Sequence, residues 1–92
     1  MARITVERPH ALGKDKAREK AELLAEKLGD KYGIDHSWDG DVVSLEGKGA
    51  KGTVQVEDAL VRVSIELNFF LSAMSSTIQS EVERQLDKAL TA

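Results

Sequence analysis

Residues 53–67 alternate between apolar and polar side chains on both sides of a short break at Asp58-Ala59. An alternation of period two is typical of a β-strand with one buried face, so the segment predicts two antiparallel strands. A two-residue turn at the break pairs Val56 with Val61, so that apolar side chains meet across the two strands. The predicted sheet therefore has one packed face and one face in solvent.

A second hairpin is predicted within residues 34–46, where Asp39-Gly40 separates two alternating runs. Asp-Gly favours a two-residue turn because both residues tolerate positive φ. A turn at these residues pairs His36 with Val43 and gathers the apolar side chains on one face. Before this hairpin, a short first strand around Ile4 is expected.

Two stretches change to the three- and four-residue spacing of a helix. The first runs from about Lys14 to Tyr32 and has the stripe Ala17, Ala21, Leu24, Leu28 and Tyr32. The second runs from about Leu71 to Leu90 and has the stripe Leu71, Met74, Ile78, Val82, Leu86 and Ala89. The sequence therefore predicts one α+β domain over residues 1–92, in the order β-α-β-β-β-β-α, with two helices packed on one face of an antiparallel sheet.

Composition narrows the function classes. The net charge is −3 without a basic cluster, which argues against nucleic acid as the main partner. No cysteine is present, so disulfides and thiol chemistry are excluded. No apolar run approaches the ~18 residues that span a bilayer, and the start alternates like a strand rather than a signal peptide. A cytoplasmic location is expected.

Two segments resemble known ligand-binding motifs. Residues 47–52 match the letters G-x-G-x-x-G, but a strand follows where a dinucleotide site needs a helix, so a hairpin loop is favoured. Residues 35–46 resemble a calcium loop, with oxygen donors, a central glycine and a final glutamate. That loop requires a helix at its exit, and the hairpin explains the same residues, so calcium remains an alternative.

The only histidines are His10 and His36, and neither has a suitably spaced nucleophile or carboxylate pair. His36 is expected on the packed face beside Trp38, and His10 is expected to cap or pack the turn before the first helix. No enzymatic activity, metal or cofactor is therefore expected.

Three apolar residues are candidates for a binding surface. Phe70 is expected to pack against the sheet, whereas Phe69 and Leu23 fall off the helical stripes. Exposed together, Phe69 and Leu23 would bind a partner, a second copy of the chain or a hydrophobic surface. Self-association is left open.

Several segments carry a family resemblance: Arg8–Gly13 with Ala17, Trp38–Asp41, Gly49–Val56 and the closing helix. Over Ile4–Leu90 the chain resembles the polyhydroxyalkanoic acid system protein family. The resemblance implies a bacterial protein of the cytoplasm that acts near polyester storage granules or the proteins that coat them. It supplies no catalytic residues.

The leading hypothesis is a non-enzymatic accessory protein of the polyhydroxyalkanoate system, acting through protein or granule-surface contacts. An alternative is a small domain that binds an acyl or hydroxyacyl group near Trp38 and Met74. The residues assigned to binding are Leu23, Phe69, Phe70, Trp38 and His10.

Overall fold

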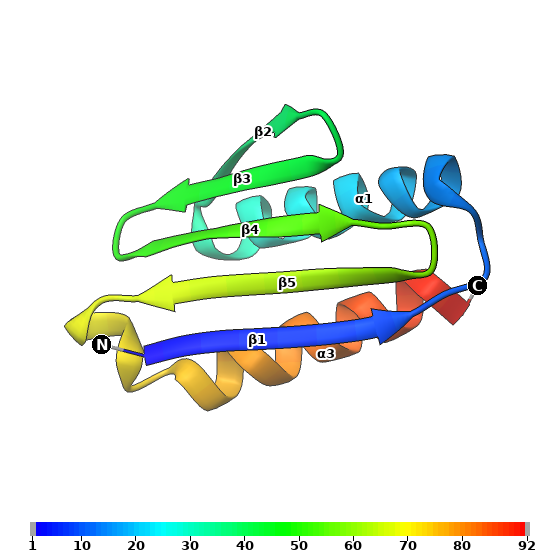
Figure 1. Cartoon of the computed structure of the whole chain (residues 1–92). Coiled ribbons are helices and arrows are strands. Elements are labelled where there is room, and N and C mark those ends of the chain that lie inside the picture. Colours follow the sequence, from blue (N-terminus) through cyan, green and yellow to red (C-terminus); the bar gives the residue numbers. More distant parts are fainter. Residues whose placement is uncertain (1, 92) are drawn as a thin grey trace.

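Five antiparallel strands form a single sheet in the order β1-β5-β4-β3-β2, and helices cover one of its faces (Figure 1). The computed structural model describes residues 2–91, apart from the side chains of Phe70 and Thr91. The elements are β1 (Ala2–Pro9), α1 (Lys14–Tyr32), β2 (Asp35–Asp39), β3 (Val42–Gly47), β4 (Ala50–Val56), β5 (Leu60–Leu67), α2 (Phe69–Ser72) and α3 (Ser75–Thr91). The predicted α+β class and element order are confirmed.

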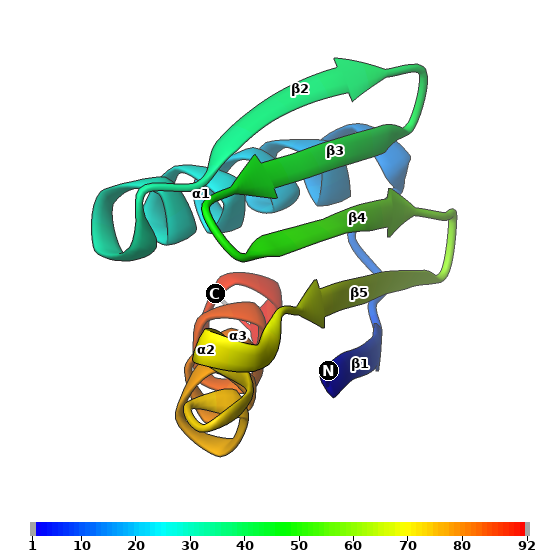
Figure 2. The same cartoon turned by 90° about the vertical axis from the view of Figure 1, so that its left-hand side faces the viewer.

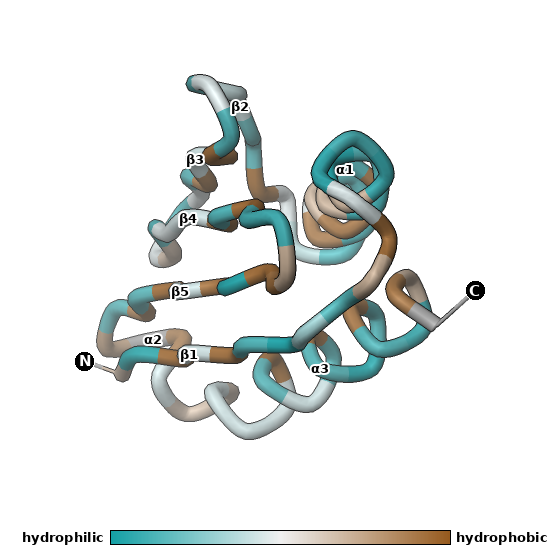
Figure 3. The backbone as a smooth tube through the Cα atoms, turned by 45° about the vertical axis from the view of Figure 1, so that its right-hand side comes forward, coloured by the Kyte–Doolittle hydropathy of each residue, from teal (hydrophilic) through white to brown (hydrophobic). Residues whose placement is uncertain are grey.

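The first strand pairs with the last strand, which places residues 2–9 beside residues 60–67 in one half of the sheet. Ile4 lies opposite Ile65 and Val6 opposite Val63, and all four side chains are buried. Hydrophobic and hydrophilic residues alternate along the strands in Figure 3. Strand order could not be read from the sequence, because alternation fixes which face is buried but not which strands are neighbours.

The β4–β5 register is confirmed, with Val56 opposite Val61. The predicted register of the β2–β3 hairpin is wrong. The turn lies one residue later than predicted, at Gly40 and Asp41, so His36 pairs with Leu45 rather than with Val43. Gly40 has φ of 64°, and no residue other than glycine has positive φ in the described chain. A type II′ turn needs positive φ only at its first central residue, which is Gly40 here, so Asp41 can keep an ordinary negative φ.

Helix α1 has the predicted bounds, and its stripe is buried as expected from Ala17 to Leu28. The helix ends because Gly33 adopts the left-handed conformation and donates its N–H to Gly29 O at 2.9 Å. Helix α1 packs on β2, β3 and β4, while α3 packs on β1 and on α1 (Figure 2). The two long helices thus form one layer.

The predicted C-terminal helix is divided into α2 and α3. The Asn68 side chain accepts from Leu71 N at 3.1 Å and starts α2 two residues early. The Met74 N–H then bonds Leu71 O, a tighter i→i−3 bond that changes the direction of the side chains. Met74 is consequently 43% exposed, so its predicted place in the buried stripe is wrong, whereas Ile78 is buried.

The glycine-rich segment forms the β3–β4 hairpin, as expected, but the predicted loop over residues 47–52 is too long, because β3 ends at Gly47 and β4 begins at Ala50. Its turn is Lys48-Gly49, and Gly52 lies inside β4. A Cβ at Gly52 would stand 2.1 Å from Ser64 O, so this glycine permits the close pairing of β4 with β5. Residues 35–46 form β2, a turn and β3, so the exit helix that a calcium loop requires is replaced by a strand.

Candidate functional site

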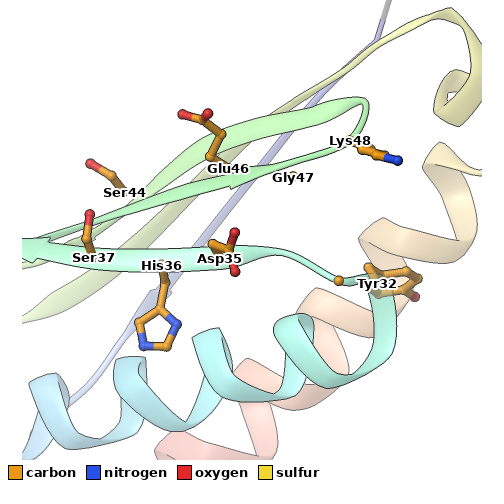
Figure 4. A pocket seen from close by; sticks show the side chains of 9 residues that line it. Tyr32, Asp35, His36, Ser37, Ser44, Glu46, Gly47 and Lys48 are labelled. Atoms are coloured by element: carbon orange, nitrogen blue, oxygen red, sulfur yellow. The ribbon is translucent and has the colours of Figure 1, made fainter.

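A depression of about 790 Å³ runs along the β2 edge of the sheet. In Figure 4 its side chains do not converge, because Ser37, Ser44 and Glu46 project from one face while His36 points toward the helices. Tyr32 and Lys48 approach it from the end of α1 and the β3–β4 turn. The polar side chains therefore do not converge on one point, as the groups of a catalytic site do, and the depression does not form a catalytic constellation.

A polar cluster joins α1 to β2. The Trp38 Nε1–H donates to Glu22 Oε1 at 2.7 Å, and His36 Nε2 lies 3.0 Å from the other oxygen of that carboxylate. The Arg18 guanidinium lies 4.8 Å from the Trp38 ring centroid, a cation–π contact. Trp38 itself is partly buried against the core. These contacts fasten the edge strand to the helix.

The electrostatics of this cluster favour a structural role. The hydrogen bond from Trp38, and then those from His36, hold the pKa of Glu22 below its ordinary value. Glu22 therefore stays ionised and is a poor general acid near neutral pH. In the described chain, Glu22 is the one side-chain hydrogen-bond partner of His36, so the pair lacks an adjacent nucleophile.

His10 is held by the backbone on both sides of its ring. Its Nδ1 accepts from Leu12 N at 3.2 Å, and Nε2 lies 2.9 Å from Glu57 O. Since Nδ1 accepts, Nε2 carries the proton and donates to the carbonyl. His10 therefore ties the β1–α1 connection to the β4–β5 turn and leaves neither ring nitrogen for a ligand. It packs the turn, as one of the two expectations had it, but it does not cap α1, whose N-cap residue Gly13 receives no side-chain hydrogen bond.

Leu23 lies beside a groove between α1 and α3. The groove has a volume of about 250 Å³ and an apolar floor that includes Leu24 and Ala89. Leu24 is buried, whereas Leu23 is 49% exposed, as the sequence predicted. Half of the Leu23 side chain therefore stands at the rim of an apolar depression, where contact with another apolar group would remove it from water.

Three lysines surround the same groove: Lys20 and Lys27 from α1, and Lys88 from α3. Lys20, Leu23, Leu24 and Lys27 share one face of α1, because residues three, four and seven positions apart lie along the same side of a helix. No ion pair is formed by these lysines within residues 2–91. The spacing of Lys20 and Lys27 around Leu23 is visible in the sequence, but only the packing of α1 against α3 brings Lys88 to the same groove.

The groove is framed by a polar link between the helices. The Lys31 Nζ lies 2.6 Å from Glu81 Oε1, and Gln85 and Arg84 donate to the same carboxylate. The Lys31 hydrogen bond is the main cause that lowers the pKa of Glu81 to about 2, followed by Gln85 and Arg84. This ionised carboxylate joins α3 to the end of α1 and fixes the spacing of the two helices.

Phe69 lies in a different part of the molecule, at the start of α2 beyond the end of β5. Its side chain is 82% exposed, which agrees with the sequence prediction. Phe69 does not line the groove beside Leu23, so the expected single patch is two separate surfaces. The Phe70 side chain lies outside the described residues, and its predicted packing against the sheet stays a prediction.

The predicted ligand site near Trp38 and Met74 is not formed in the described structure. Trp38 is in β2, at one edge of the sheet. Met74 follows α2, which contacts β5 in the other half. The sheet order therefore places the two side chains apart, which the sequence could not show.

The fold defines the class of protein: a five-stranded antiparallel sheet with one helical layer. An NMR structure of PA4090 from Pseudomonas aeruginosa has a similar fold, with a TM-score of 0.65 and 11% sequence identity over 100% of this chain and 88% of that chain. At this identity the likeness concerns the fold alone. A comparison with curated proteins found no match.

The chain belongs to the family described as "Putative polyhydroxyalkanoic acid system protein", whose model matches residues 4–90. The match spans both long helices and all five strands. The resemblance inferred from the sequence is therefore confirmed. In the described part of the chain, no helix is long and apolar enough to cross a membrane.

Proposed function

We propose that this chain is a non-enzymatic accessory protein of the polyhydroxyalkanoate storage system, and that it acts in the cytoplasm through contacts with the granule surface or with granule-coating proteins. The observation that carries the proposal is the 82% exposure of Phe69 in a protein whose other large apolar side chains are mostly buried. Family membership supplies the cellular context.

The position of Phe69 suits a contact residue. It begins α2, whose first turn is capped by the Asn68 side chain and further tied by Ser72 Oγ, which donates to Asn68 O at 2.8 Å. An aromatic ring on a capped turn loses little conformational freedom on binding, and its burial removes a large apolar area from water. Leu23 supplies a second exposed apolar residue on α1.

The ionisable groups most suited to proton transfer have structural partners, which further supports a non-enzymatic role. Glu22 is occupied by Trp38 and His36, and His10 is occupied by two backbone groups. Each would have to break a hydrogen bond of the fold before it could transfer a proton to a substrate.

The test is co-sedimentation of the purified protein with native polyhydroxyalkanoate granules. The variants are Phe69→Ser, Leu23→Ser and the double substitution, each checked for an intact fold by circular dichroism. Because the two residues lie on separate surfaces, the single variants show which surface makes the contact. The control Ala11→Ser with Ala59→Ser adds the same two hydroxyl groups at other exposed positions. Wild-type protein that stays in the supernatant, with and without granule-coating proteins, would refute the proposal.

A further inference from the structure

We propose that the groove between α1 and α3 binds an acidic amphipathic helix of a partner protein. The inference deepens the proposed function and rests on it, since it specifies the chemistry of a protein that this chain would contact at the granule. The groove is called the α1–α3 groove below, and it is lined by the apolar residues Leu23, Leu24 and Ala89, by the lysines Lys20, Lys27 and Lys88, and by Gln85.

The α1–α3 groove is long enough for a short segment of helix. Its α1 side extends from Lys20 to Lys27, a length of about 10 Å or two helical turns. Apolar side chains at three- and four-residue spacing on an incoming helix would reach Leu23 and the floor. Because α1 and α3 pack on each other, the incoming helix would lie over both of them and would bury the exposed half of Leu23.

The positive charges beside the groove indicate that the bound helix is acidic. The cations stand on both sides of the groove, with Lys20 and Lys27 on α1 and Lys88 on α3. Carboxylates flanking an apolar stripe would therefore meet a positive charge on either side. These lysines form no ion pair within the described residues, so an acidic partner would not have to displace an existing carboxylate.

Other occupants fit less well. The volume of about 250 Å³ is below the usual range of about 300–1,000 Å³ for small-molecule sites. A lipid surface would find little apolar area to take up, because Leu24 is buried at the floor and could not insert into a bilayer. The side chains that project from a helix can enter the groove while the helix lies on top of it, whereas a flat surface would touch mainly the lysines.

The experiment uses the full chain and a capped synthetic peptide of about 14 residues, with leucines along one face and glutamates on both flanks. Its matched control is the same peptide with lysine at every glutamate position. Calorimetry gives the Kd, and chemical shifts of 15N-labelled protein locate the site. We expect the glutamate peptide alone to bind, with shifts at Lys20, Leu23 and Lys88, and with affinity that falls as salt is added.

Two variants test the assignment. Lys20→Glu with Lys27→Glu should weaken binding of the glutamate peptide by about tenfold or more and should let the lysine peptide bind. Lys48→Glu with Lys51→Glu makes the same change in net charge on the β3–β4 hairpin and should leave the Kd unchanged. Equal losses in both variants, or shifts confined to another surface, would overturn the groove as the site.

Granule co-sedimentation separates this inference from the function that it deepens. Wild-type protein that sediments with granules but ignores the glutamate peptide would refute the acidic helix and leave the proposed function standing. Peptide binding by a protein that ignores granules and their coating proteins would refute the proposed function. Adsorption to vesicles of anionic phospholipid, without peptide binding, would show that the lysines contact lipid and would also overturn the inference.

Discussion

At the scale of single residues, Glu22 is a polar group whose hydrogen bonds stabilise the fold rather than bind a ligand. Its carboxylate accepts from Trp38 and His36, both of which belong to the short edge strand β2. An edge strand has backbone partners on one side only, so side-chain contacts contribute more of its attachment than they do in a central strand. Trp38 is therefore better explained as an anchor of β2 than as part of a ligand site.

Trp38→Phe should destabilise the protein by about 1 kcal/mol at neutral pH, because it removes the indole donor and keeps an apolar ring. The expected loss is no larger because Glu22 is 35% exposed, and water weakens the interactions of a partly solvated carboxylate. The lowered folded-state pKa of Glu22 means that this stabilisation is present above the ordinary carboxyl pKa and is lost as the pH falls through the lowered value. Urea unfolding followed by circular dichroism at neutral and acidic pH measures both effects. A destabilisation that does not shrink in acid would contradict the assignment.

Residue-level features divide into those that local pattern predicts and those that it does not. The pairing of Val56 with Val61 followed from alternation across a turn, and the exposure of Leu23 followed from helical spacing. The Trp38–Glu22 hydrogen bond joins two elements separated by a loop, and neither residue type nor spacing identifies the partner. Gly52 looked like part of a flexible loop, but its role depends on Ser64 in the neighbouring strand.

At the scale of elements, the helical layer decides the shape of the α1–α3 groove. The apolar stripes predicted both long helices, but Asn68 and the tightened turn at Met74 divide the second one. A cap depends on backbone geometry as well as residue type, so periodicity alone could not predict the break. The lysines of the groove come from two helices, and their convergence required the packing of α1 against α3.

The link between Lys31 and Glu81 makes the stability of this layer depend on pH. The folded-state pKa of Glu81 is lowered to about 2 from 4.5, so its stabilisation is complete above the higher value and is lost as the pH falls toward the lower one. Glu81→Gln should therefore reduce the free energy of unfolding at neutral pH and flatten its fall over this acidic range. Thermal unfolding at several pH values measures the slope.

The matched control for Glu81 is Glu19→Gln, which removes a carboxylate from the exposed surface of α1. No ion pair of Glu19 is present in the described structure, so the control should follow the wild-type pH dependence. Parallel pH profiles for wild type and Glu81→Gln would show that Glu81 does not link the two helices.

At the scale of the whole molecule, the pairing of β1 with β5 joins the N-terminal strand to the C-terminal half of the chain. Helix α1 then crosses to cover β2, β3 and β4, and α3 returns to cover β1. Neither half of the sheet can keep its apolar face buried if the other half separates, since the two helices also pack on each other. The whole chain is therefore expected to unfold as one cooperative unit.

Ile4→Ala tests this cooperativity, because Ile4 is in β1 while the single tryptophan, Trp38, is in β2 at the opposite edge of the sheet. Ile4 is 1% exposed, so its truncation should cost about 2–4 kcal/mol through lost burial and a residual cavity. In a cooperative domain, tryptophan fluorescence and circular dichroism should shift to the same lower urea midpoint. Thr5→Ala, on the solvent face of the same strand, should leave the midpoint nearly unchanged. A fluorescence midpoint that stays at the wild-type value would mean that the β2 edge unfolds independently of β1, and the chain would then have to be described as two units.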